Sequence, residues 1–318
     1  MDQTKPSSEC TIYREAAYAL CAYVDPADGD VHEFDPPFVD DLLEPLGVIE
    51  LGSGTGVVAA SVARAIRYAN RPGRFVIATD LPDVCPLLQH NLGINTSSEG
   101  NHSESDVVFV RSLTWGNLDH ATSIASEFDS RRLTHIVCSD LASTLVDFDL
   151  LRHPWLTIFR KHSQVYFPEL LGPLLRTLIH LTSSSCAPLS VPPVKIVISY
   201  KVRSLPRETP FWSAFGLWFS FQPVLARRRV RPTESKRAPP DDEPDAPESW
   251  RQIGADEDAD RTFVFVAHRR PESIAWHVPE TDKELMDGVG TRGTTSRKGD
   301  DTFEMILFMA MGIDDIGE

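Results

Sequence analysis

One stretch near the start of the chain, residues 48–56, restricts more than any other what this sequence can fold into. It begins as an apolar strand that carries an acidic residue, Glu50, next to its end. A turn with glycine at positions 52, 54 and 56 follows, and then a helix rich in alanine and valine. Glycine has no Cβ, so the backbone of such a turn can approach a ligand closely. The pattern is typical of a site for a nucleotide-like cofactor at the edge of an open α/β sheet.

Apolar strands alternate with helices over residues 47–200, and this alternation predicts a mostly parallel sheet with helices on both faces. Ligands of such sheets bind outside the carboxyl ends of the strands. The expected strands are 47–51, 75–79, 107–110, 134–138 and 194–200, and the expected helices between them are 57–68, 81–91 and 170–179.

The outer parts of the chain contribute further elements. Apolar residues at helical spacing predict a helix over residues 11–24. An aromatic run predicts a helix over 211–221, and 224–231 is expected to be a strand. Two more apolar runs, 263–267 and 303–308, are strand candidates, and the sequence leaves open which of them joins the central sheet.

These elements divide the chain into four parts. We expect an N-terminal helical extension over residues 1–46 and a cofactor-binding core over 47–231. Residues 232–260 are rich in proline and acidic residues, which predicts a flexible loop. Residues 261–318 are expected to supply C-terminal strands that complete the sheet.

Composition and charge exclude several classes of protein. The net charge of −15 argues against nucleic-acid binding, which needs basic residues to displace counterions from phosphate. The chain has no apolar run of about twenty residues, so no membrane span is expected. The N-terminus lacks a signal pattern, so we expect a cytoplasmic protein, with the nucleus as the alternative. The five cysteines are scattered without a C-x-x-C pair, so neither a disulfide framework nor a metal site is expected.

Acidic residues stand at the expected strand ends: Glu50, Asp80 and Asp140, with Ser139 beside the last. Buried unpaired carboxylates cost free energy, which favours a functional use for Glu50 and Asp80. Asp80 suits the ribose hydroxyls of any nucleoside cofactor. Glu50 would repel a pyrophosphate but could bind the ammonium group of a methionine moiety. The sequence therefore favours S-adenosylmethionine, and an NAD enzyme is the alternative.

Four motifs in this order resemble those of the seven-strand protein-lysine methyltransferases, and more narrowly the methyltransferase-like-21 group and its fungal relatives. They are Glu50–Gly56, Asp80-Leu81-Pro82, Leu113-Thr114-Trp115-Gly116 and Ser139-Asp140. The similarity covers residues 47–200 well and the two ends loosely. It implies a Rossmann-like seven-strand methyltransferase sheet with helices on both faces, and S-adenosyl-L-methionine as the cofactor.

The resemblance also implies roles for individual residues. The methionine end would be held by Glu50 and the turn, and the ribose by Asp80. Trp115 would lie against the adenine. Asp140 and Tyr166 would belong to the D-x-x-Y motif that borders the channel for the acceptor lysine. The full set of implied cofactor-binding residues is Glu50, Gly52, Ser53, Gly54, Thr55, Gly56, Asp80, Leu81, Trp115 and Ser139.

The sequence departs from the family where Asp140-Leu141 is separated from Val165-Tyr166 by residues 142–164. Removing this segment restores a continuous Asp-Leu-Val-Tyr motif. We interpret the segment as a retained intron of the gene or as a lineage-specific insertion. In the second case Tyr166 would be displaced and activity impaired.

The leading hypothesis is a monomeric, S-adenosylmethionine-dependent N-methyltransferase that modifies a lysine of a protein substrate. Two alternatives remain open. The acceptor could be a small amine of the nicotinamide kind, or the chain could bind the cofactor with catalysis impaired by residues 142–164.

Overall fold

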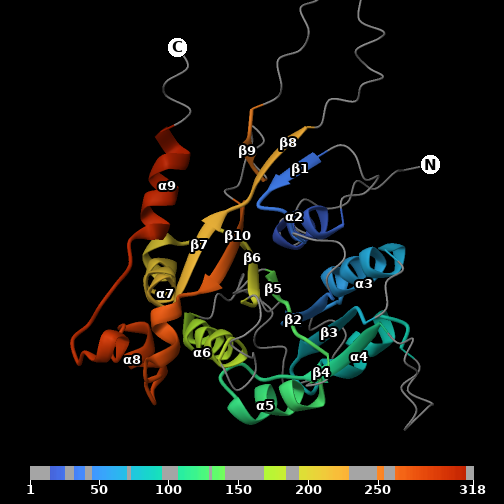
Figure 1. The fold of residues 1–318 in the computed structure, drawn as a ribbon, viewed down its shortest axis with the longest axis horizontal. Coiled ribbons are helices and arrows are strands. Elements are labelled where there is room, and N and C mark those ends of the chain that lie inside the picture. Colours follow the sequence, from blue (N-terminus) through green and yellow to red (C-terminus); the bar gives the residue numbers. More distant parts are fainter. Residues whose placement is uncertain are drawn as a thin grey trace, which may run out of the picture.

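The computed structural model describes residues 15–25, 32–39, 45–69, 73–94, 107–128, 131–139, 168–183, 193–228, 249–253 and 262–312. A seven-stranded sheet in the order β4-β3-β2-β5-β6-β10-β7 forms its centre (Figure 1). The strands are β2 (Gly47–Leu51), β3 (Phe75–Asp80), β4 (Val108–Ser112), β5 (His135–Ser139), β6 (Lys195–Lys201), β7 (Phe219–Pro223) and β10 (Thr262–Arg269).

The first five of these strands are parallel to their neighbours, whereas β10 runs antiparallel to both β6 and β7. Every residue of β2 and of β6 is buried, as expected of parallel strands that are covered on both faces. The seven-strand α/β sheet confirms the predicted fold class, and the five strands expected over residues 47–200 are all present.

Helices cover both faces of the sheet. Successive side chains of a strand point to opposite faces, so Val48 packs on one side and Ile49 on the other. The side of Val48 is covered by α2 (Glu15–Val24), α3 (Val57–Ala69) and α4 (Cys85–Asn91). The side of Ile49 is covered by α5 (Leu118–Glu127), α6 (Leu171–Leu181), which follows the short η2 (Pro168–Leu170), and by α7 (Leu205–Trp218) and α9 (Thr302–Gly312).

The prediction of a strand over 303–308 is wrong, because these residues lie in helix α9. Phe303, Ile306 and Leu307 are buried at helical spacing, and the Phe303 ring stacks on Trp212 of α7 with centroids 4.9 Å apart. The aromatic helix also ends earlier than predicted, since strand β7 begins at Phe219. Only β10 among the C-terminal candidates joins the sheet.

A second, three-stranded sheet has the order β1-β8-β9. It joins β1 (His32–Asp35), β8 (Leu225–Arg228) and β9 (Arg251–Gln252). The strand expected over 224–231 is therefore present as β8, but it belongs to this sheet rather than to the central one. Strand β9 lies within the segment 232–260 that was expected to be a loop.

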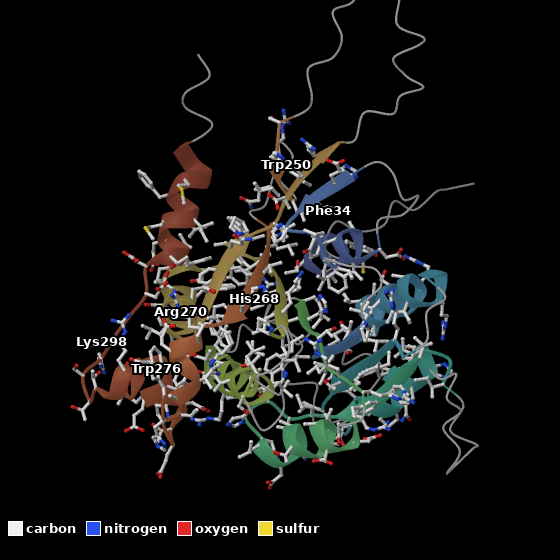
Figure 2. All side chains as sticks on the ribbon, in the orientation of Figure 1. Phe34, Trp250, His268, Arg270, Trp276 and Lys298 are labelled. Atoms are coloured by element: carbon white, nitrogen blue, oxygen red, sulfur yellow. The ribbon has the colours of Figure 1, made fainter. Side chains whose placement is uncertain are left out.

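The segment after β10 packs back onto α7 and α6. It contains η4 (Pro271–Ala275), α8 (Asp282–Met286) and η5 (Thr291–Gly293). Arg270 donates to the Gly216 carbonyl at 2.7 Å and pairs with Asp300 at 3.3 Å, and the Trp276 ring contacts Trp218 edge-on. Figure 2 labels Arg270 and Trp276 in this segment. No helix in the described part of the chain is long and apolar enough to cross a membrane.

Candidate functional site

The glycine turn after β2 lies at the centre of the sheet, between the carboxyl ends of β3 and β5. Gly52, Gly54 and Gly56 all have positive φ, at 72°, 54° and 82°. This is the left-handed region that only glycine adopts without strain. At Gly56 a Cβ would also lie 2.8 Å from Leu88, so the turn and α4 pack closely.

Hydrogen bonds fix the turn to the end of β3. The Ser53 amide donates to the Thr79 carbonyl at 2.8 Å, and the Thr79 amide donates to the Ser53 hydroxyl at 3.1 Å. Asp80 accepts from the Gly54 amide at 2.7 Å through Oδ2 and from the Leu81 amide at 2.7 Å through Oδ1. Each carboxylate oxygen keeps a second lone pair, which can accept from a ribose hydroxyl.

Glu50 lies directly behind the turn and is 1% exposed. Its Oε2 accepts from the Ala59 amide of α3 at 3.0 Å. Burial and, to a smaller extent, the nearby Asp80 raise the pKa of Glu50 to about 8, a value that hydrogen bonds from Ser53 and Ala59 keep from rising further. No lysine or arginine of the described segments pairs with this carboxyl group. An ammonium group bound at the turn would supply the missing positive charge, so the site fits the methionine end of S-adenosylmethionine.

Trp115 lies against the turn from the loop after β4. A Cβ on Gly52 would be 3.0 Å from Cζ2 of the indole, so a larger residue at position 52 would collide with the ring. The loop is held by the Gly116 amide, which donates to Thr177 Oγ1 of α6 at 2.7 Å, and by the Leu113 amide, which donates to the Asp80 carbonyl at 2.8 Å.

The structure thus brings together the predicted cofactor-binding residues at the carboxyl ends of β2, β3 and β4. Leu81 is 47% exposed beside Asp80. Ser139 ends β5, which lies next to β2 on the side opposite β3, and it is paired in register with Ser199 of β6. Asp140, Tyr166 and residues 142–164 lie outside the described residues, so their catalytic assignment stays a prediction.

One residue at this edge of the sheet was missed by the sequence reasoning. Glu208, in the first turn of α7, is 1% exposed. Its Oε2 accepts from the Arg203 amide at 3.2 Å, and its Oε1 has no partner within the described parts of the chain. The signal that could have found it is its spacing, since Glu208 precedes the buried Phe211 and Trp212 by three and four residues and therefore shares their face of the helix.

Comparisons with known proteins agree with this geometry. A family model described as lysine methyltransferase matches residues 2–169. The protein-lysine methyltransferase METTL21E of Bos taurus is 38% identical over 69 residues, which cover 22% of this chain and 20% of that protein. The Mus musculus protein of the same name is 39% identical over 69 residues, covering 22% and 24%. The alignment therefore spans less than a quarter of the length of these relatives.

Among solved structures, the CcbJ methyltransferase of Streptomyces caelestis is 13% identical, with a TM-score of 0.31, over 72% of this chain and 70% of that one. The S-adenosylmethionine-dependent methyltransferase SibL is 14% identical with a TM-score of 0.28, over 54% and 35%. These scores are too low to support an argument, and the fold assignment rests on the sheet order of this chain. The matched family model covers more than half of the 318 residues, from the N-terminus through β5 and into η2. The chain therefore belongs to the lysine methyltransferase family.

Proposed function

We propose that this protein is an N-methyltransferase that transfers the methyl group of S-adenosylmethionine to a lysine side chain of a protein substrate. The observation that carries the proposal is the buried Glu50 carboxyl group behind a glycine turn, with no cationic partner among the described residues. The family match and the relatives named as protein-lysine methyltransferases support the choice of acceptor.

Each residue of the turn has a distinct task in this proposal. Glu50 binds the ammonium group of the cofactor, and the positive-φ glycines let its methionine end lie against the backbone. Asp80 accepts from the ribose hydroxyls, and Trp115 contacts the adenine. An NAD pyrophosphate would instead bring negative charge to Glu50, which is why a dinucleotide fits this turn poorly.

The cofactor supplies an electrophilic methyl group on a sulfonium. The acceptor amine must reach it as the neutral base, so the lysine has to lose its proton before or during transfer. A narrow, dry channel lowers the pKa of a lysine and thereby favours the neutral form. We assign Asp140 and Tyr166 the task of orienting the amine by hydrogen bonds, while the released proton passes to water. Positioning alone can supply much of the rate.

A transfer assay tests the proposal. The purified protein is incubated with methyl-labelled S-adenosylmethionine and proteins of a cell extract, and labelled residues are located by mass spectrometry. We expect label on lysine of one or a few proteins, and none with Asp80→Ala. Label found only on small amines would show that the acceptor is a small molecule and not a protein lysine. Tight binding of S-adenosylhomocysteine without any labelled product would indicate a cofactor-binding protein.

A deletion variant tests the role of residues 142–164. Joining Leu141 to Val165 restores the continuous Asp140-Leu141-Val165-Tyr166 motif. If the segment displaces Tyr166, the deletion raises kcat for the lysine acceptor and leaves the affinity for S-adenosylhomocysteine unchanged. An inactive deletion variant that still binds S-adenosylhomocysteine would show that the segment contributes to the acceptor site.

A further inference from the structure

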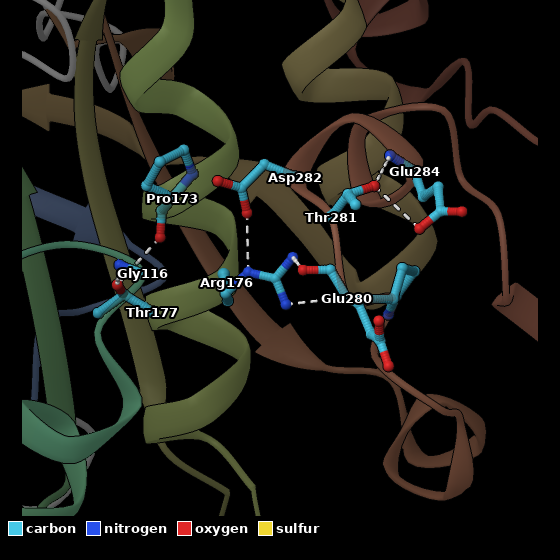
Figure 3. Close-up of polar contacts among 9 residues, drawn as sticks. Gly116, Pro173, Arg176, Thr177, Glu280, Thr281, Asp282 and Glu284 are labelled. Carbon is cyan, nitrogen blue, oxygen red and sulfur yellow. Dashed lines mark hydrogen bonds and ion pairs between the residues drawn. The ribbon is translucent and has the colours of Figure 1, made fainter.

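A pocket of about 510 Å³ has Trp115, whose ring also lies against Gly52 of the turn, in its lining. Its lining comes from the loop after β4 and the start of α5, from α6, and from the segment around the start of α8. Figure 3 shows α6 between Gly116 on one side and Glu280 on the other. Its lining residues are Trp115, Gly116, Leu118, Pro173, Arg176, His180, Glu280 and Asp282. None of the roles proposed above for cofactor or acceptor uses this pocket, although it shares Trp115 with the cofactor site.

The wall formed by the loop after β4 is fixed to α6. The Gly116 amide donates to the Thr177 hydroxyl at 2.7 Å, and this hydroxyl donates to the Pro173 carbonyl at 3.0 Å. Gly116 has a φ of 82°, and a Cβ there would lie 3.3 Å from Pro173. The loop therefore has little freedom to move away from the helix.

The opposite wall is fixed by Arg176. Its guanidinium donates to Asp282 Oδ1 at 2.7 Å, to the Pro279 carbonyl at 2.7 Å and to the Glu280 carbonyl at 3.2 Å (Figure 3). Thr281 caps α8 by accepting from the Glu284 amide at 3.2 Å. Both walls are thus formed before any ligand binds, which lowers the entropy cost of binding.

The pocket carries one unbalanced negative charge. The charge of Arg176 is paired with Asp282, and burial together with Arg176 and Arg269 lowers the pKa of His180, so that its imidazole is neutral at pH 7. The Glu280 side chain is exposed and makes no ion pair or hydrogen bond within the described segments. A phosphate or carboxylate ligand would meet Glu280 and an arginine that already donates to three acceptors, so the charge favours a cation.

The aromatic and apolar lining further favours a ligand that combines a positive charge with apolar surface. Trp115 offers an aromatic ring for a cation–π contact, and Leu118 and Pro173 offer apolar surface for an aliphatic stem. Lysine and arginine side chains combine such a stem with a terminal positive charge. We propose that the pocket binds a basic side chain of the protein substrate, at a position other than the acceptor lysine. The choice of a protein substrate as the source of this side chain rests on the proposed function.

Fluorine NMR on protein labelled with 5-fluorotryptophan tests the pocket without requiring catalysis. Trp115 is assigned with Trp115→Phe, and the probes are acetyl-Gly-Gly-Arg-Gly-Gly-amide and the same peptide with citrulline in place of arginine. We expect the arginine peptide to shift the Trp115 resonance saturably and the neutral citrulline peptide not to. Glu280→Gln should weaken the arginine peptide about two- to fivefold, the range for one exposed ion pair. Glu280→Lys should abolish the shift, and the matched control Glu272→Gln, an exposed acid outside the pocket, should leave it unchanged.

A Trp115 resonance that does not move, or that responds equally to both peptides or equally in Glu280→Lys, would overturn the inference. The same variants then separate the pocket from the enzymatic proposal. With the acceptor protein found in the transfer assay, Glu280→Gln should raise its KM about two- to fivefold and leave kcat and the affinity for S-adenosylhomocysteine unchanged. If the arginine peptide shifts the Trp115 resonance but the transfer assay finds no methylated protein, the proposed function is refuted and the pocket for a cation is still supported.

Discussion

Replacing Glu50 with glutamine should make the free protein more stable at high pH while it weakens cofactor binding. Glutamine has nearly the same shape, and its carbonyl can still accept from the Ala59 amide. It removes only the ability to ionise. The wild-type carboxyl group is buried without a cationic partner in the described chain, so its ionised form is costly until an ammonium group binds beside it.

The magnitude follows from the pKa of Glu50, which is raised from an ordinary value of 4.5 to about 8. A raised pKa of an acid means that the folded state holds its proton more tightly than the unfolded state does. The free energy of unfolding of the wild type therefore decreases as the pH rises from about 4.5 to about 8 and stays constant above that range. The full effect of Glu50→Gln is a gain of at most roughly 5 kcal/mol at pH 8 and above, and close to none at pH 4.

Urea unfolding of wild type and Glu50→Gln at pH 5 and pH 8, without cofactor, measures this difference. The control is Glu304→Gln, the same chemical change at an exposed position of α9, which should show no such pH dependence. Calorimetry should show that wild-type affinity for S-adenosylhomocysteine rises between pH 6 and pH 8 and that Glu50→Gln loses most of it. A stability difference that does not vary with pH, or an unchanged affinity in Glu50→Gln, would refute the reasoning.

Three further substitutions test other parts of the structure. Asp80→Asn should weaken S-adenosylhomocysteine about tenfold to a hundredfold in calorimetry, because a charged acceptor is lost, and an unchanged affinity would remove Asp80 from the site. Gly56→Ala should lower the free energy of unfolding by about 1 to 3 kcal/mol, since its φ is 82° and a Cβ would press on Leu88, and urea titration measures this. Arg269→Met should cost about 2 to 4 kcal/mol in the same assay, because buried acceptors lose their donor and the cation–π contact with Trp218 is removed, and a cost near zero would contradict this.

The central sheet could be predicted because each of its strands can be recognised from a short run of consecutive residues. Strands buried on both faces appear as continuous apolar runs, and the turn after β2 needs glycine at the positions with positive φ. Most of the residues proposed to bind the cofactor, such as Glu50 and Asp80, could be named for the same reason, since they stand at strand ends or in the turn that follows, whereas Trp115 was named from the family resemblance. Most of the proposed site could therefore be predicted from residues that are close together in the sequence.

The remaining features depend on contacts between distant segments. A short apolar run such as Phe303–Phe308 fits a strand or a buried helix equally well, and only its packing on Trp212 decides for the helix. Strand β8 has its partner β1 almost two hundred residues away in sequence, so no local pattern assigns it to the second sheet. The pocket beside Trp115 likewise depends on Arg176 binding the segment around Asp282, a contact across 106 positions.

The central claim is that the turn between β2 and α3 binds S-adenosylmethionine rather than a dinucleotide. Titration calorimetry of the free protein at pH 8 with S-adenosylhomocysteine and, separately, with NAD tests it most directly. The geometry predicts saturable binding of S-adenosylhomocysteine, lost in Asp80→Ala, and no binding of NAD. Saturable binding of NAD with no response to S-adenosylhomocysteine would contradict the account.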